Sequence, residues 1–156
     1  MKSSSNGGYR KSASLPFIDI NRHLVLFAVL SLLVSAGAWT LDITGAVYPC
    51  PFCRIQRTGI GLLGLVILFL PYLNPFIARY LSLAVGGFSF VVGAMQHFTY
   101  GWQMMFQGTF VLHDPWIEDP WVLSACAMLI LAGQIGIIFE ADPAAAKADA
   151  RPPRLG

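Results

Sequence analysis

Residues 120–139, PWVLSACAMLILAGQIGIIF, form a run of 20 positions without Asp, Glu, Lys or Arg. A transmembrane helix needs about 20 mainly apolar residues to cross a hydrocarbon core about 30 Å thick. Three further runs without these charges, 23–41, 58–78 and 80–113, contain 19, 21 and 34 residues. The longest is too short for two crossings and a turn, and its second half is polar and aromatic. The sequence therefore predicts four membrane helices, one for each run.

The overall composition agrees with a membrane protein. Of the 156 residues, 56% are hydrophobic and 12% are charged, whereas a soluble domain carries about 25% charged residues. This deficit excludes a disordered chain, a nucleic-acid-binding domain and most soluble enzymes. The formal net charge of +2 is too small to indicate an anionic partner. Membrane lipid, and not nucleic acid, is the expected surrounding.

The expected fold is an all-α bundle of four transmembrane helices, because backbone groups cannot remain unpaired in lipid. The helices are predicted near Leu24–Leu41, Gly59–Tyr72, Tyr80–Tyr100 and Trp121–Phe139, and the second can begin earlier, in the Arg54–Arg57 turn. Residues 59–64, GIGLLG, match G-x-G-x-x-G, but no strand precedes them as a dinucleotide site requires. Small residues at this spacing favour close helix packing. Ser89/Gly93 and Ala132/Gly136 have a similar spacing.

The distribution of Lys and Arg predicts the orientation. The N-terminal segment, Arg79 and the C-terminal tail together carry eight of these residues, and the opposite side carries only Arg54 and Arg57. Both termini are therefore expected in the cytoplasm, with 42–58 and 101–120 facing outward. The predicted organisation is a partly disordered cytoplasmic segment (1–22), a membrane domain (23–140) and a disordered cytoplasmic tail (141–156). Cleavage of the first segment as a signal peptide is the alternative, and it would spoil the charge balance.

The chemistry predicted from the sequence centres on Cys50 and Cys53. They form a Cys-Pro-Phe-Cys motif just before the expected second helix, on the outward side. Helix N-terminal amides stabilise a thiolate, and Arg54 and Arg57 add positive charge nearby. The thiolate is the form that attacks disulfides. A structural disulfide and half of a zinc site remain alternatives, although a structural zinc needs four ligands. No metal site is predicted.

The stretch Cys50–Arg57, CPFCRIQR, at the outer end of the second of four helices, resembles the DsbB family of membrane thiol:quinone oxidoreductases. The resemblance implies Cys50 and Cys53 as the catalytic pair, and Arg57 and His97 as residues of the quinone site. It also implies ubiquinone or menaquinone as cofactor and a periplasmic, DsbA-like thioredoxin-fold dithiol protein as partner. The expected location is the bacterial inner membrane, with the site on the periplasmic side.

The sequence departs from this family in the loop Gly101–Pro120, which contains no cysteine. DsbB proteins usually carry a second cysteine pair there, so a two-disulfide relay cannot operate in this chain. Cys50 and Cys53 would have to meet the partner and also pass electrons onward. The alternative is a non-catalytic membrane subunit or assembly factor that keeps the scaffold and a static disulfide.

Other polar and aromatic residues receive structural interpretations. His113 lies beside an acidic cluster that includes Asp119 and is expected in a solvated turn, with partner docking or proton handling as the alternative. Cys126 is interpreted as a packing residue of the fourth helix. The stripe Trp102, Met105, Phe106 and Phe110 predicts a short helix on the outer membrane face.

Overall fold

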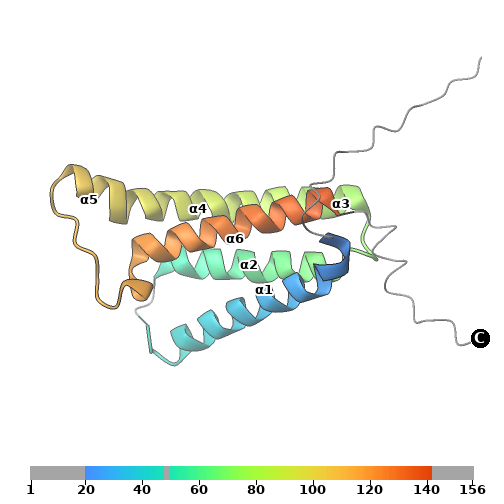
Figure 1. The fold of residues 1–156 in the computed structure, drawn as a ribbon, viewed down its shortest axis with the longest axis horizontal. Coiled ribbons are helices and arrows are strands. Elements are labelled where there is room, and N and C mark those ends of the chain that lie inside the picture. The colour runs from blue at the N-terminus through green and yellow to red at the C-terminus, as the bar shows by residue number, and fades with distance from the viewer. Residues whose placement is uncertain (1–19, 48–49, 142–156) are drawn as a thin grey trace, which may run out of the picture.

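The computed structural model describes residues 20–47 and 50–141 and confirms an all-α fold (Figure 1). Four helical segments are long and apolar enough to cross a membrane. The first is α1 (Ile20–Ile43), the second is α2 (Pro51–Leu68) and the last is α6 (Pro120–Glu140). The tails expected in the cytoplasm lie almost wholly outside the described residues.

The third segment, Pro75–Phe106, is a 32-residue succession of helical elements. It contains α3 (Pro75–Leu81), α4 (Gly87–His97) and α5 (Gln103–Phe106). Two π-helical turns join these elements, η1 (Ser82–Gly86) and η2 (Phe98–Trp102). A short 3₁₀ turn, η3 (Trp116–Glu118), precedes α6.

All four helices begin earlier than the expected ranges, the first at Ile20 and each of the others at a proline. The second helix begins at Pro51 rather than Gly59, because Cys50 is its N-cap and Pro51 has the fixed φ suited to a first helical turn. The third segment begins at Pro75, where the Asn74 side chain accepts a hydrogen bond from the Phe76 N–H at 2.9 Å.

The separate surface helix expected around Trp102–Phe110 is not formed. Its first residues are the final turns of the third segment, which ends at Phe106. Gly108 follows with a φ of +69°, a conformation that suits glycine and turns the chain away from the helix axis. The prediction of a helix was therefore right for Trp102–Phe106 and wrong in making it independent.

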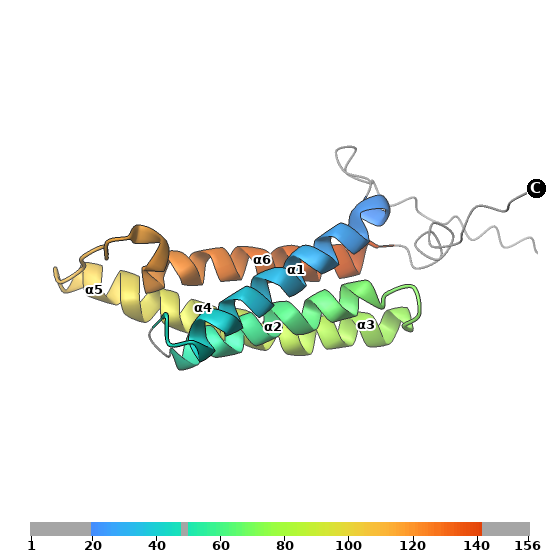
Figure 2. The ribbon, with the colours of Figure 1, turned by 90° about the horizontal axis from the view of Figure 1, so that it is seen from below.

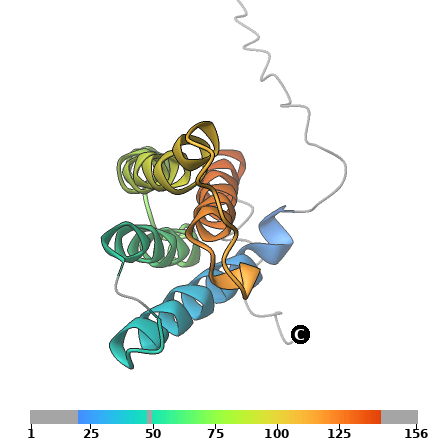
Figure 3. The ribbon, with the colours of Figure 1, turned by 90° about the vertical axis from the view of Figure 1, so that its left-hand side faces the viewer.

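The helix α2 occupies the middle of the bundle, with α1 on one side and α4 and α6 on the other (Figures 2 and 3). Glycines on α2 make these approaches close. An added Cβ at Gly59 would meet Ser89 of α4, and one at Gly61 would meet Ser35 of α1. The packing interpretation of residues 59–64 is therefore confirmed. A Cβ at Gly136 would meet nothing, so that glycine is not in a helix contact.

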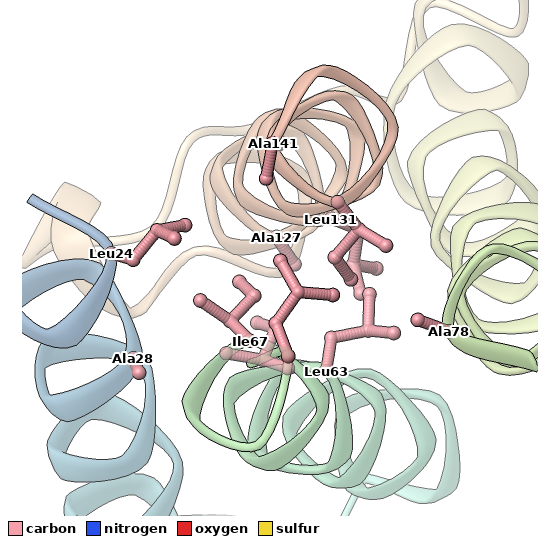
Figure 4. Close-up of a cluster of buried hydrophobic side chains, with 11 residues drawn as sticks. Leu24, Ala28, Leu63, Ile67, Ala78, Ala127, Leu131 and Ala141 are labelled. Atoms are coloured by element: carbon pink, nitrogen blue, oxygen red, sulfur yellow. The ribbon is translucent and has the colours of Figure 1, made fainter. Parts of the chain in front are cut away.

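The apolar core lies between α1, α2, α3 and α6, and Figure 4 shows its side chains converging there. Leu63 and Ile67 of α2 and Leu131 of α6 are almost completely buried. Large apolar side chains also cover the outside of the bundle, for example Leu129, which is 75% exposed. An apolar exterior around small-residue contacts is the arrangement expected of helices surrounded by lipid.

Candidate redox site

The two cysteines of the CPFC motif occupy the first turn of α2. Cys50 is the N-cap, with extended backbone angles (φ −103°, ψ 117°), and its sulfur accepts a hydrogen bond from the Cys53 N–H at 3.4 Å. Both are thiols and both are half-buried. The unpaired N–H groups and the positive end of the helix dipole therefore lie beside these sulfurs.

The sulfur of Cys53 faces a buried pair of glutamine amides. Gln96 of α4 places its Nε2 3.4 Å and its Oε1 3.7 Å from this sulfur. The Nε2 of Gln56 donates to the same Oε1 at 2.7 Å, and Gln96 Nε2 donates to the carbonyl of Pro120 at 3.2 Å. Gln96 has no exposed surface and Gln56 is almost completely buried. Residues of α2, α4 and α6 thus meet around the Gln96 amide.

Arg57 points toward α1. Its Nη1 donates to the carbonyl of Ala38 at 2.6 Å and lies 3.2 Å from the Asp42 carboxylate. Its guanidinium carbon lies 5.4 Å from the centre of the Trp39 ring. Its Nε donates to the backbone carbonyl of Cys53 at 3.1 Å. Arg57 therefore holds the first turns of α2 against the end of α1.

Asp42 is a central residue of this end of the bundle. Arg54 donates to its two carboxylate oxygens at 2.7 and 3.1 Å, and Arg57 lies at 3.2 Å. The Asp42 side chain is only 1% exposed. One carboxylate therefore contacts both arginines that follow the cysteines.

His97 lies in the last turn of α4 and contacts α6. Its Nδ1 lies 3.1 Å from both the carbonyl of Trp121 and the Oγ of Ser124. Its ring stacks on the Trp121 ring at 5.2 Å with an interplanar angle of 21°. The two residues assigned to a quinone therefore face different neighbours: Arg57 contacts α1, and His97 contacts α6.

Sequence reasoning missed Gln56 and Asp42 and noted Gln96 only as the neighbour of His97. A signal was present, because polar side chains inside an apolar helix face the bundle interior or a site. Gln56 of α2 and Gln96 of α4 are such residues, and they lie near the same end of the bundle. The sequence does not show which residues of α2 face which residues of α4.

An apolar groove of about 510 Å³ opens beside the start of α2. Trp39 of α1, Thr58 and Leu62 of α2, and Phe88 of α4 line it, and Arg54 borders it. Trp39 thus contacts both this groove and Arg57. His97 is not among the lining residues.

The loop before α6 is fixed by Asp119. This residue caps α6 by accepting the Trp121 N–H at 2.8 Å, and it accepts the His113 N–H and ring Nδ1 at 3.0 and 2.9 Å. Burial raises its pKa, but these hydrogen bonds outweigh that effect and leave the pKa below its ordinary value. The His113 side chain itself is 70% exposed, as a solvated turn requires.

Cys126 is exposed on the outside of α6 and does not pack inside the bundle, so the packing interpretation was wrong. Within the described ranges 20–47 and 50–141, no group of three His, Cys, Asp or Glu residues is placed to hold a metal ion.

Comparison with known families gives one match. The family model described as "Disulfide bond formation protein DsbB" matches residues 21–111, which are more than half of the chain. No curated protein and no solved structure matches the sequence. The matched range contains the CPFC motif, both glutamines of the buried pair and His97. The chain is therefore a multi-pass membrane protein of the DsbB family, with a role in disulfide bond formation.

Proposed function

We propose that this protein is a thiol:quinone oxidoreductase that oxidises a periplasmic dithiol through the Cys50–Cys53 pair and passes the electrons to a membrane quinone. The observation that carries the proposal is that both cysteines lie in the first turn of α2, where the Cys53 N–H donates to the Cys50 sulfur at 3.4 Å. A bacterial inner membrane is the proposed location, with this turn on the periplasmic side. Ubiquinone or menaquinone is the proposed acceptor.

The exchange step follows from the placement of the two sulfurs. A thiolate of the reduced partner, a DsbA-like thioredoxin-fold protein, attacks Cys50 of the disulfide and forms a mixed disulfide. The electron pair of the broken S–S bond stays on Cys53, next to the helix N-terminus. The second thiol of the partner then releases the oxidised partner and leaves Cys50 and Cys53 as a dithiol.

The residues around the groove fit a quinone. A flat, weakly polar ring suits an apolar groove of about 510 Å³ with Trp39 and Phe88 in its walls. Arg54 borders the groove, and Trp39 in its wall contacts Arg57, which is not itself a lining residue. A quinone bound there would supply the two-electron oxidant that restores the disulfide. His97 contacts α6 instead, so the proposal places the acceptor on the Arg57 side.

The test is quinone reduction by the purified full-length protein in the presence of excess small dithiol. We expect turnover in the natural sequence, loss of turnover in Cys53→Ser and a weaker rate in Arg57→Ala. Cys126→Ser is the matched control, since it removes the third cysteine from the outside of α6. A Cys53→Ser protein with full turnover would refute the proposal. An inert protein whose disulfide resists the dithiol would instead identify a structural subunit.

A further inference from the structure

The buried amide of Gln96 is the only side-chain contact that α4 makes with the Cys53 sulfur among the hydrogen bonds of the described residues. The contact joins the last turn of α4 to the first turn of α2. Gln96 has no exposed surface. Nothing in the family resemblance assigns a role to this residue.

Its neighbours fix the orientation of the Gln96 amide. The carbonyl of Pro120, 3.2 Å away, can only accept a hydrogen bond, so the NH₂ group must face it. The Oε1 faces the Nε2 of Gln56 at 2.7 Å, and this short contact satisfies it as an acceptor. The second N–H of Gln96 is then directed at the Cys53 sulfur, 3.4 Å from Nε2.

We propose that Gln96 is a catalytic hydrogen-bond donor to the Cys53 thiolate, and that Gln56 is a positioning residue that orients the Gln96 amide. This inference rests on the proposed function and deepens it, because it names the group that stabilises the leaving sulfur. Arg57, by contrast, makes its hydrogen bonds to backbone carbonyls of α1 and α2.

The step is thiol–disulfide exchange with balanced atoms and electrons. A thiolate of the dithiol substrate forms a bond to Cys50, and the Cys50–Cys53 bond breaks. Its electron pair becomes the charge on the Cys53 sulfur, which accepts the N–H of Gln96. Attack by the second substrate thiol then oxidises the substrate by two electrons and leaves the cysteine pair reduced. The rate rises as the leaving thiolate becomes more stable.

A hydrogen bond to a charged group contributes about 1.5–3 kcal/mol, and each 1.4 kcal/mol corresponds to about a tenfold change. Part of this stabilisation is present when the S–S bond is breaking. We therefore expect Gln96→Met to slow reduction of the Cys50–Cys53 disulfide by dithiothreitol about tenfold. Gln56→Met should slow it less, because the Gln96 donor is still present but can rotate.

The experiment uses the full chain with Cys126→Ala, so that only the pair contributes thiols. Gln134→Met is the matched control. Gln134 is also a buried glutamine, and its Nε2 donates to the carbonyl of Ile60 at 2.9 Å, but it lies elsewhere on α6. Its replacement should leave the exchange rate within about twofold. In the double variant Gln56→Met/Gln96→Met, the loss should equal that of Gln96→Met alone, since Gln56 acts through Gln96.

Alkylation of reduced Cys53 in a Cys50→Ala background separates a donor from a merely structural residue. Loosened packing would expose the sulfur and speed alkylation, whereas loss of the donor leaves less thiolate and slows it at a given pH. We expect slower alkylation in Gln96→Met, and also in Gln96→Asn, whose shorter side chain withdraws the amide. Equal or faster alkylation in both variants would overturn the inference. Because this assay needs no quinone and no turnover, its result is independent of the proposed function.

Discussion

Replacing Gly59 by alanine tests whether close packing of α2 on α4 is what holds Cys53 against Gln96. An added Cβ would lie 2.6 Å from the Cβ of Ser89. Carbon atoms in contact normally lie about 3.5–4.0 Å apart, so the two helices must separate by roughly 1 Å. Rotation of the Ser89 side chain cannot relieve the clash, because its Cβ is fixed to the backbone.

The expected cost of this overpacking is about 1–3 kcal/mol in the free energy of unfolding. A separation of roughly 1 Å would also stretch the Gln96 Nε2–Cys53 Sγ distance from 3.4 Å beyond hydrogen-bonding reach. We therefore expect slower disulfide reduction by dithiothreitol in addition to lower stability. Stability can be measured by detergent-induced unfolding in mixed micelles, followed by circular dichroism.

The controls come from the same helices. Gly87→Ala in α4 would meet no atom within 4 Å, so its Cβ should cost nothing and gain helix propensity. Ser89→Gly should restore both stability and exchange rate to Gly59→Ala, because it removes the opposing Cβ. Ser89→Ala should not, because it keeps that atom. The reasoning fails if Gly59→Ala is as stable as the natural sequence, or if Ser89→Ala rescues it as well as Ser89→Gly.

Two further predictions concern the charged residues at this end of the bundle. The lowered pKa of Asp119 means that its stabilising effect is complete above the ordinary carboxyl pKa and is lost as pH falls through the native value. Asp119→Asn keeps the helix cap and removes the charge, so thermal unfolding followed across acid pH should show a flatter stability profile. A profile as steep as that of the natural sequence would contradict this assignment. Asp42→Asn should lower the unfolding temperature more than Arg54→Gln, because Asp42 serves two arginines and is 1% exposed, whereas Arg54 is 48% exposed. A larger drop in unfolding temperature for Arg54→Gln than for Asp42→Asn would contradict the central role of Asp42.

The four runs without charged residues predicted the number of membrane helices, because the hydrocarbon thickness sets the length of a spanning helix. The Gly-rich stretch 59–64 likewise predicted close packing, which depends only on side-chain size. The start of α2 was placed too late, at Gly59 or in the Arg54–Arg57 turn, because Cys50 is an unusual N-cap, although Pro51 is a common first helical residue. The motif CPFC pointed to redox chemistry without needing the fold.

The partners of the polar residues could not be predicted in the same way. Two consecutive residues of a helix point about 100° apart, so the choice between Gln96 and His97 depends on the rotation of α4 about its axis. The structure places Gln96 on Cys53 and His97 on α6. Arg57 was expected to add positive charge near the sulfurs, and its spacing from the cysteines could not show that it also contacts Asp42 of α1.

The length of the third segment limits how a soluble partner can approach. Its 32 residues span about 48 Å at 1.5 Å per residue, compared with a hydrocarbon core of about 30 Å. Tilt alone would have to exceed about 50° to absorb the difference, which is beyond the usual range. Part of the segment therefore lies outside the hydrocarbon core, and Figure 1 shows α5 and the following loop extending past the start of α2. A soluble protein that approaches this end of the bundle therefore meets α5 and its loop before it reaches the start of α2.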